Sequence, residues 1–382
     1  MRLIRKGRFS MKKKLLFITY TYSLGGGAEK ILTNIVNSLN PEKYDIDILE
    51  YAQYGVKDET VNPYINKMAP IVSMQDDSKY KRLWKNIQVY SYAGFLRKRK
   101  EKYDLEISFN YLIPTFLLSK DTPTVAWFHG DISNLKRMPY CRMIQRHSLK
   151  YVNKIVAISE NTKQSIVEVY PEYSHKLEVI YNGFDVGAIR KEGQAENEID
   201  IKQPSIVYVG RLEEGKNPLI LLDVVKKLKD DGKIVYLYYV GQGEKNKEIL
   251  QKRDMYGLQE QVFLLGYQKN PYPIMRKCSA ICMMSHSEGF PTVFAEGLAL
   301  GTPFISTPVG GVKELSNGGR CGCIVNSVSE CVDAIKKFVL DEEEHRRMQV
   351  ACEEHIHIFD LQTQIAQIET LFDDMMCKNE NR

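Results

Sequence analysis

Two glutamates with seven residues between them are the strongest chemical feature of the sequence. Pro291 suits the first turn of a helix, so we expect Glu288 in the loop before that helix and Glu296 on its second turn. Carboxylates accept hydrogen bonds from hydroxyls, and this pair could hold two polyols, such as a hexose and a ribose. A solvated helix face is the alternative, which the apolar neighbours Phe290 and Phe294 disfavour.

A loop with two cations is the second such feature. Arg211 and Lys216 follow an apolar strand pattern that ends at Gly210, and Asn217 and Pro218 are expected to mark the start of the next helix. A guanidinium, an ammonium and a helix N-terminus at one point would bind a diphosphate. Cations of a solvated loop are the alternative reading of the same residues.

Three consecutive glycines, Gly25, Gly26 and Gly27, stand between an expected strand and an expected helix. They let the backbone approach a ligand closely, and the helix would offer its N-terminus to an anion. The motif is not a complete dinucleotide fingerprint, because Lys30 stands where the third glycine would be, and it is not a P-loop. A turn with only a packing role therefore stays open.

Strand and helix patterns alternate along the chain, as is typical of parallel α/β sheets. Strand patterns occupy residues 14–20, 46–51, 105–109, 124–128 and 154–158 of the first half, and residues 205–210, 234–240, 262–265, 280–284 and 303–306 of the second. Helical patterns of the second half occupy residues 218–229, 245–256, 292–300 and 329–340. The polar residues 191–202 between the halves are typical of a linker. We expect two Rossmann-like units with a ligand cleft between them, at the carboxyl ends of the strands.

The charge of the chain is uneven. Residues 1–190 carry 30 Lys and Arg against 19 Asp and Glu, whereas the remainder carries 23 against 29. A basic first half is compatible with an anionic membrane, a polyanion or an uneven solvated surface. Asp45 and Asp47 have the D-x-D spacing of some metal-binding pairs, but they alternate with Ile46 and Ile48 and are interpreted as the polar face of a strand.

Targeting and redox features point to the cytoplasm. The basic start and the short apolar run at residues 15–18 are not expected to be a secretory signal, and Met11 is an alternative start. No segment approaches the roughly 20 apolar residues of a membrane-spanning helix. The eight cysteines have no metal-like pairing and are expected to be free thiols.

Taken together, these motifs resemble those of glycosyltransferase family 4, whose members have the GT-B fold. The resemblance rests on Gly210, Arg211 and Lys216 with the spacing of Glu288 and Glu296. Further segments fit in the same order: residues 25–29, residues 182–185, residues 308–311 and Glu314. The resemblance implies an acceptor-side Rossmann-like domain of residues 11–188 and a nucleotide-sugar-binding Rossmann-like domain of residues 203–358. A C-terminal helix within residues 360–378 is expected to join the first domain.

The resemblance implies a retaining transfer that needs no metal and no cofactor. Arg211 and Lys216 would neutralise the departing diphosphate, and Glu288 would hydrogen-bond the donor sugar. Glu296 would hold the ribose, and His129, at the end of a strand, would face the donor sugar. The remaining expected donor-binding residues are Gly26, Gly27, Gly210, Gly243, Gly289, Phe290, Pro291, Thr292 and Val293.

Members of this family often glycosylate lipid-linked precursors of bacterial capsule, exopolysaccharide or lipopolysaccharide. We therefore expect a donor that is UDP-linked, a glycan or lipid-linked acceptor, no nucleic-acid partner, and a peripheral position at the inner face of the plasma membrane. The membrane contact is expected from the aromatic residues Trp84, Tyr90, Tyr92 and Phe95 beside the basic residues Lys81, Arg82, Lys85 and residues 97–100. A nucleotide-sugar epimerase and a non-catalytic nucleotide-sugar-binding module are the alternatives, and a nicotinamide oxidoreductase is less favoured.

Overall fold

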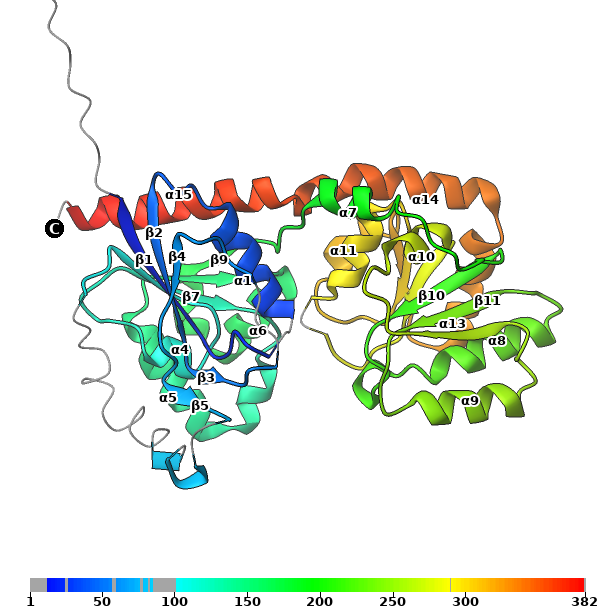
Figure 1. Ribbon diagram of the computed structural model, residues 1–382, viewed down its shortest axis with the longest axis horizontal. Helices are drawn as coiled ribbons and strands as arrows, with labels where there is room; N and C mark the ends of the chain where they lie inside the picture. Colours follow the sequence, from blue (N-terminus) through cyan, green and yellow to red (C-terminus); the bar gives the residue numbers. More distant parts are fainter. Residues whose placement is uncertain are drawn as a thin grey trace, which may run out of the picture. The chain divides into compact units, whose positions relative to one another are not determined.

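The chain forms two compact units, seen in a computed structural model that describes residues 12–24, 27–56, 60–75, 78–81, 83–84, 101–288 and 290–380 (Figure 1). The first unit comprises Met1–Ala157, Ser165–Ile180 and Ile365–Arg382. The second comprises Ile158–Gln164 and Tyr181–Gln364. Each unit is built on its own parallel sheet.

The first unit has a seven-stranded sheet in the order β4-β2-β1-β6-β7-β8-β9, and all its pairings are parallel. A short pair, β3 (Ala52–Gln53) and β5 (Val72–Ser73), lies apart from it. The strands of the large sheet are β1 (Lys13–Thr19), β2 (Tyr44–Glu50), β4 (Ile65–Lys67), β6 (Leu105–Ser108), β7 (Thr124–Phe128), β8 (Lys154–Ala157) and β9 (Leu177–Val179).

Alternate residues of β1 pack on the two faces of that sheet, because successive side chains of a strand point in opposite directions. Leu16 and Ile18 belong to a buried cluster that includes Leu149 of α5 (Pro139–Tyr151). Phe17 lies with its ring centroid 6.3 Å from that of Phe372 in α15 (Leu361–Glu380). The helices of this part of the chain are α1 (Gly27–Ser38), α4 (Ile113–Phe116), η1 (Ser133–Arg137), α5 (Pro139–Tyr151), α6 (Glu160–Val169), η2 (Pro171–Lys176) and α15 (Leu361–Glu380).

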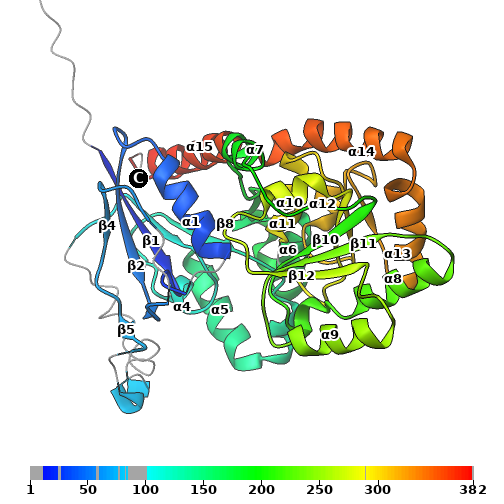
Figure 2. The ribbon, with the colours of Figure 1, turned by 45° about the vertical axis from the view of Figure 1, so that its right-hand side comes forward.

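The second unit has a six-stranded parallel sheet in the order β12-β11-β10-β13-β14-β15. Helices α8 (Ile220–Asp230) and α9 (Asn246–Met255) lie on one side of it, and α10 (Tyr272–Lys277) and α11 (Thr292–Ala299) lie on the other (Figures 1 and 2). Its strands are β10 (Ser205–Val209), β11 (Tyr236–Val240), β12 (Val262–Gly266), β13 (Ala280–Met283), β14 (Phe304–Ser306) and β15 (Gly322–Ile324). Its helices are α7 (Val186–Glu192), η3 (Glu214–Lys216), α8 (Ile220–Asp230), α9 (Asn246–Met255), α10 (Tyr272–Lys277), α11 (Thr292–Ala299), α12 (Val312–Ser316), α13 (Val328–Ala334), η4 (Ile335–Val339), α14 (Glu342–His355) and η5 (Ile356–Phe359).

The expected alternation of strands and helices is confirmed, with two corrections. The helix expected directly at Pro218 begins at Ile220, because Asn217 takes a left-handed conformation (φ 48°) and ends the short turn η3. The helical pattern at residues 329–340 is α13 followed by the π-helical turn η4. The strands β4, β9 and β15 and the helices α5 and α14 were not expected. All eight cysteines are free thiols.

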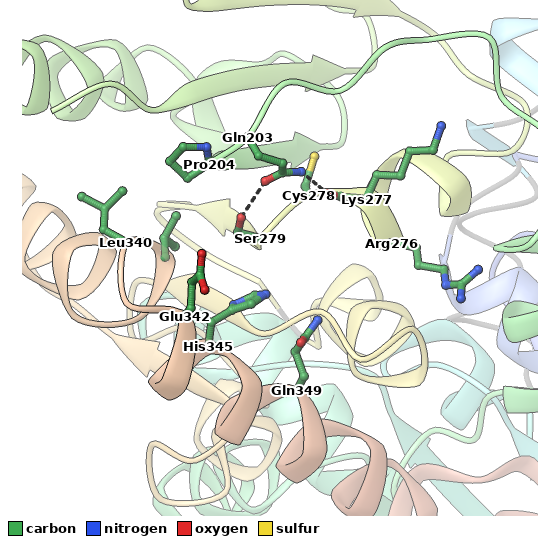
Figure 3. A pocket seen from close by; sticks show the side chains of 11 residues that line it. Gln203, Pro204, Arg276, Lys277, Cys278, Ser279, Leu340, Glu342, His345 and Gln349 are labelled. Atoms are coloured by element: carbon green, nitrogen blue, oxygen red, sulfur yellow. Dashed lines mark hydrogen bonds between the residues drawn. The ribbon is translucent and has the colours of Figure 1, made fainter.

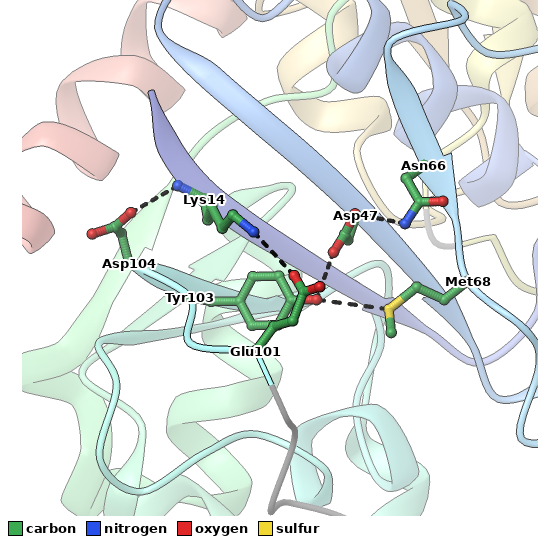
Figure 4. A network of polar contacts seen from close by, with 7 residues as sticks. All are labelled: Lys14, Asp47, Asn66, Met68, Glu101, Tyr103 and Asp104. Atoms are coloured by element: carbon green, nitrogen blue, oxygen red, sulfur yellow. Dashed lines mark hydrogen bonds and ion pairs between the residues drawn. The ribbon is translucent and has the colours of Figure 1, made fainter. Parts of the chain in front are cut away.

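Asp47 lies on the polar face of β2, as the alternation of the strand predicts (Figure 4). Its carboxylate accepts hydrogen bonds from the Tyr103 hydroxyl at 2.6 Å and from the Asn66 side chain at 2.9 Å. In the same region Lys14 donates its backbone N–H to Asp104 and pairs with Glu101. The residue that resembled half of a metal-binding pair therefore joins β2 to β4 and to the residues before β6.

Candidate functional site

The loops at the carboxyl edge of the second unit's sheet are hydrogen-bonded to one another in the order of the strands. The loop after β11 binds the last residue of β12, since Gly241 N donates to Gly266 O at 2.8 Å. The loop after β10 binds the loop after β11 through Leu212 N and Gln242 O at 3.0 Å. We call this set of loops, together with those after β13 and β14, the loop ladder.

The other half of the loop ladder is built in the same way. His286 N, after β13, donates to Gly215 O, after β10, at 3.0 Å. Gly310 N, after β14, donates to Glu288 O at 3.1 Å. Four loops that are far apart in the sequence, together with the end of β12, thus form one continuous backbone structure, and Arg211, Lys216, Gly243 and Glu288 all lie within it.

Two tyrosines of the sheet hold the loop that carries Arg211 and Lys216. The Tyr208 hydroxyl, from β10, donates to the carbonyl oxygen of Arg211 at 2.6 Å. The Tyr239 hydroxyl, from β11, donates to the carbonyl oxygen of Pro218 at 2.7 Å, and burial raises its pKa. Because the two rings pack with centroids 5.5 Å apart, the loop is held near both of its ends by one buried pair.

The charged groups of the loop ladder are paired with one another. Lys216 forms an ion pair with Glu288, and both side chains are largely buried, with 22% and 13% of their surfaces exposed. Lys245 pairs with Glu214 at 2.6 Å, and this hydrogen bond lowers the pKa of the Glu214 carboxyl. Arg211 is 78% exposed and reaches Glu213 at 3.1 Å. Both cations expected from the sequence lie in one site, and Lys245 adds a third.

Glycines are required where the loops cross. A Cβ atom on Gly243 would lie 2.2 Å from the carbonyl oxygen of Leu212, and one on Gly241 would lie 1.9 Å from that of Gly210. Gly311 has φ +78°, and a Cβ there would meet the Phe290 ring at 2.4 Å. Close contact between backbones, rather than turn formation alone, explains these glycines. A Cβ on Gly215, by contrast, would meet nothing within 4 Å.

The helix α11 carries the second glutamate, as expected. Pro291 occupies the position before the helix, and no side chain caps its first turn. Glu296 is half-buried on the second turn. Burial raises the pKa of Tyr272, at the start of α10, and the negative charge of the nearby Glu296 carboxylate raises it further. Phe290 is buried and lies 6.2 Å from Phe184, ring centroid to centroid. Thr292 and Val293 form the first turn of α11, whose backbone N–H groups form the positive end of the helix dipole.

In the first unit, His129 follows β7 directly and carries a neutral imidazole. Its Nε2 atom is buried and has no hydrogen-bond partner among the residues that the structure describes. Burial lowers its pKa to about 3. The ring lies 4.1 Å from the Phe109 ring, centroid to centroid. Such a group can exchange a hydrogen bond with a ligand without carrying charge.

Two family models together match most of the chain. The model described as Glycosyltransferase Family 4 matches residues 25–187, and the model described as Glycosyl transferases group 1 matches residues 189–354. The chain belongs to glycosyltransferase family 4. The family membership inferred from the motifs is therefore confirmed.

Relatives of this family 4 chain include transferases that act on lipid-linked glycans. One, from Campylobacter jejuni, is an N-acetylgalactosamine-N,N'-diacetylbacillosaminyl-diphospho-undecaprenol 4-alpha-N-acetylgalactosaminyltransferase, 27% identical over 84% of this chain and 87% of the relative. Another from the same organism, a GalNAc-alpha-(1->4)-GalNAc-alpha-(1->3)-diNAcBac-PP-undecaprenol alpha-1,4-N-acetyl-D-galactosaminyltransferase, is 24% identical over 87% and 90%.

Solved structures of glycosyltransferases share the fold. HepE of Anabaena in complex with UDP has a TM-score of 0.73 at 18% identity, covering 94% of this chain and 100% of HepE. The apo form of the lipopolysaccharide outer core galactosyltransferase WaaB has a TM-score of 0.69 at 18% identity, covering 96% and 98%. The expected GT-B fold, with two Rossmann-like domains, is confirmed.

The glycine motif of this family 4 chain follows a loop that a buried glutamate holds in place. Glu50, at the end of β2, accepts hydrogen bonds from Tyr22 N at 2.6 Å, Ser23 N at 3.0 Å and the Ser23 hydroxyl at 2.7 Å. Gly27 opens α1, and a Cβ there would meet nothing within 4 Å. The predictions for Gly25, Gly26 and Gly289 lie outside the described residues.

The expected membrane segment is described only in part. Tyr80, Leu83 and Trp84 are exposed, with 85%, 58% and 60% of their surfaces accessible. The predictions for Arg82, Lys85, Tyr90, Tyr92, Phe95 and residues 97–100 lie outside the described residues. Within the part of the chain that the structure describes, no helix combines the length and the apolar character needed to cross a membrane.

A separate cavity of about 590 Å³ lies at the other edge of the second unit's sheet (Figure 3). Gln203 and Pro204, just before β10, line it together with Ser279, just before β13. His345 of α14 also lines the cavity, and burial lowers its pKa. None of the residues expected to bind the donor borders this cavity. We therefore place the candidate site at the loop ladder.

Proposed function

We propose that this family 4 glycosyltransferase transfers a sugar from a nucleotide diphosphate sugar to a lipid-linked or glycan acceptor with retention of configuration. The observation that carries the proposal is the meeting of Arg211, Lys216 and Glu288 within the loop ladder, beside the uncapped start of α11. Cations and helix N-termini stabilise the charge of a departing diphosphate, and a carboxylate accepts hydrogen bonds from sugar hydroxyls.

The Lys216–Glu288 pair suggests how these residues change partners when the donor binds. A buried ammonium and a buried carboxylate each need a polar or charged partner, and in the structure these two form an ion pair with each other. With donor present, we propose that Lys216 turns to the diphosphate and that Glu288 accepts hydrogen bonds from the sugar. Arg211, which is exposed and paired with Glu213, exchanges this partner for the diphosphate in the same step.

The proposed reaction breaks the bond between the anomeric carbon and the phosphate oxygen and forms a bond from the same carbon to the acceptor oxygen on the same face of the sugar. The acceptor hydroxyl gives its proton to the departing phosphate. Negative charge grows on the diphosphate as positive charge grows on the sugar, so Arg211 and Lys216 stabilise the transition state more than the ground state. No metal and no cofactor enters this scheme.

The remaining residues are assigned to binding. Glu296 holds the ribose, and His129 offers its neutral imidazole to the donor sugar. The backbone at Gly26, Gly27, Gly210, Gly243 and Gly289 approaches the donor, and the turn from Phe290 to Val293 brings the N-terminus of α11 to it. We propose UDP as the nucleotide, a role in bacterial surface-polysaccharide synthesis, and a peripheral position on the cytoplasmic face of the membrane. The support is the resemblance to relatives whose acceptors are undecaprenol-linked and to HepE bound to UDP.

The test is a donor screen that measures nucleotide release with and without acceptor. We incubate the full-length protein with UDP-, GDP-, dTDP- and ADP-sugars and with short-chain polyprenyl diphosphate glycans, in the presence and absence of EDTA. Transfer that depends on acceptor, gives a product of unchanged anomeric configuration and persists in EDTA supports the proposal. Release of a free sugar isomer would indicate an epimerase, and binding without turnover of any donor would indicate a binding module.

A further inference from the structure

The cavity of about 590 Å³ at the amino edge of the second unit's sheet has no part in the proposed reaction (Figure 3). Its volume lies within the range of roughly 300–1,000 Å³ that is typical of small-molecule sites. The sheet separates it from the loop ladder, because Ser279 lies just before β13 and Glu288 lies after this strand. A strand of four or five residues spans about 13–17 Å. A molecule in the cavity would therefore lie about that far from the loop ladder.

One wall of the cavity is held in place by its own hydrogen bonds. The Gln203 side chain accepts a hydrogen bond from the Ser279 hydroxyl at 2.9 Å and donates one to the carbonyl oxygen of Lys277. Pro204 lies beside this pair and adds apolar surface. This wall is therefore fixed and partly apolar.

The opposite wall is one side of α14. Glu342, His345 and Gln349 line the cavity at positions i, i+3 and i+7, which share one side of a helix. In Figure 3 their side chains project from successive turns of α14 on the side that faces Ser279. Leu340, just before the helix, adds an apolar group at one end. The cavity thus lies between a row of polar side chains and a partly apolar wall.

The polar groups on α14 have unused hydrogen-bonding capacity. The Nδ1 atom of His345 is buried and has no hydrogen-bond partner among the residues that the structure describes. Burial lowers the pKa of His345, so at neutral pH its imidazole is uncharged and offers one donor and one acceptor. Glu342 forms no ion pair within the described ranges, whereas Glu343 and Glu344 both pair with Arg347. Buried polar atoms of proteins are nearly always hydrogen-bonded, so His345 is suited to bind a ligand.

A second, smaller cavity continues the row of polar groups. Arg276 lines the first cavity and also a neighbouring one of about 260 Å³. Glu353 borders the second cavity and follows Gln349 by four positions, one turn further along α14. From Glu342 to Glu353 the helix rises about 16 Å. The row is therefore long enough for a ligand of more than one small ring.

This combination of groups favours a saccharide. Carboxylate, imidazole, amide and guanidinium groups together can accept hydrogen bonds from sugar hydroxyls and donate to them. The apolar surface of Pro204 and Val339 suits the CH groups of a sugar ring. A phosphate or a nucleotide would meet the like charge of Glu342. A purely apolar ligand would leave His345 and Gln349 without partners. The ligand class is therefore an uncharged oligosaccharide.

We propose that this cavity, together with its neighbour at Arg276, is a second carbohydrate site that binds an uncharged oligosaccharide away from the loop ladder. The use of the site rests on the proposed function, in which the enzyme transfers sugars to a glycan. A glycan held here stays at the enzyme between transfers, which raises its effective concentration for the next one. Binding at this site itself requires no donor and no turnover.

The test measures binding of soluble oligosaccharides to the full-length protein by saturation-transfer NMR and calorimetry. The panel comprises oligomers of glucose, galactose, N-acetylglucosamine and N-acetylgalactosamine, with UDP present in excess to occupy the donor site. The double variant His345→Gln/Gln349→Leu should weaken binding of the preferred oligosaccharide about fivefold or more, because hydrogen bonds to its hydroxyls are lost. The matched controls are His357→Gln and Arg346→Gln, at exposed positions outside both cavities, and they should bind like the parent.

Further measurements separate the possible outcomes. The melting temperature, and nucleotide release with a short acceptor, should be unchanged in the double variant, which shows that it folds and that transfer is independent of this site. Oligosaccharide binding that the double variant loses, in a protein that turns over no donor, would support the site and contradict the proposed function. The inference is wrong if the parent binds no oligosaccharide of the panel, or if parent and double variant bind it equally. Binding of inorganic phosphate or AMP that the double variant loses, without any saccharide binding, would also overturn it and assign the cavity to an anion.

Discussion

Lys216 and Glu288 form an ion pair that joins the loop after β10 to the loop after β13. The two residues are 72 positions apart in the sequence, and both side chains are mostly buried. Removal of one partner from such a pair leaves a buried charge without compensation. The pair is therefore a direct way to test the loop ladder as a donor site.

We expect Lys216→Ala to lower the kcat for nucleotide release by about 10²- to 10³-fold, because one cation that stabilises the departing diphosphate is lost. Glu288→Gln should also lower kcat, since an amide accepts fewer hydrogen bonds from the sugar. Initial rates at saturating donor measure both. Lys233→Ala, at an exposed position before β11, is the control. Near-normal turnover in Lys216→Ala would exclude the assigned role.

Tyr208 tests whether the conformation of the cation loop matters. Tyr208→Phe removes the hydroxyl that donates to the Arg211 carbonyl and costs about 1 kcal/mol of interaction. If the loop must be held for catalysis, kcat should fall about fivefold, while the melting temperature changes little. Tyr236→Phe, for which no hydroxyl hydrogen bond is present among the described residues, is the matched control. Equal kcat in the two variants would mean that the loop keeps its conformation without the hydroxyl.

Two glycines of the loop ladder should respond differently to a methyl group. Gly243→Ala places a Cβ against the Leu212 backbone and should lower the free energy of unfolding by about 1–3 kcal/mol or more. Gly215→Ala places it in open space and should leave the melting temperature unchanged. If the diphosphate approaches this turn, Gly215→Ala should nevertheless raise the KM for donor. Thermal unfolding and donor titration measure the two effects, and unchanged KM would place the diphosphate elsewhere.

His129 makes the stability of the protein depend on pH. Its pKa is about 3 in the folded chain, against an ordinary value near 6.5. Between these two pH values the imidazole is therefore protonated in the unfolded chain and neutral in the folded chain. The stability it contributes is complete above pH 6.5 and is lost as the pH falls toward 3. Between pH 7.5 and pH 5 this loss is about 2 kcal/mol. Urea unfolding of parent and His129→Gln should therefore show a flatter profile for the variant, and parallel profiles would refute the buried neutral imidazole.

Sequence patterns predicted the fold well because buried parallel strands are continuous apolar runs that end in glycine loops. Residues 14–20 and 205–210 illustrate this, since β1 and β10 match them closely. The strand β15 was not expected, because Gly322–Ile324 is only three residues long and follows the polar turn at Asn317 to Arg320. The helix α14 begins with three glutamates, and its apolar residues do not recur at a clear helical spacing. The sequence pattern therefore does not predict this helix, which is recognised only from its packing in the structure.

Part of the candidate site could be expected from the sequence, since Arg211, Lys216, Glu288 and Glu296 carry the charge and belong to recognisable motifs. The residues that hold them could not. Tyr208 and Tyr239 read as ordinary apolar strand residues, and only the structure shows where their hydroxyl groups donate. Lys245 follows a glycine loop, which is a weak signal, and its ion pair with Glu214 depends on a contact across 31 residues.

The loop ladder limits how donor selectivity can change. Each loop is bound to its neighbour through backbone atoms, so an insertion or deletion in one loop would displace the others, whereas an exchange of side chains would not. Tyr267 follows β12 and is 71% exposed, and Gln242 is exposed in the loop after β11. Engineering for a different nucleotide or sugar should therefore substitute such outward-facing side chains and keep every loop at its present length.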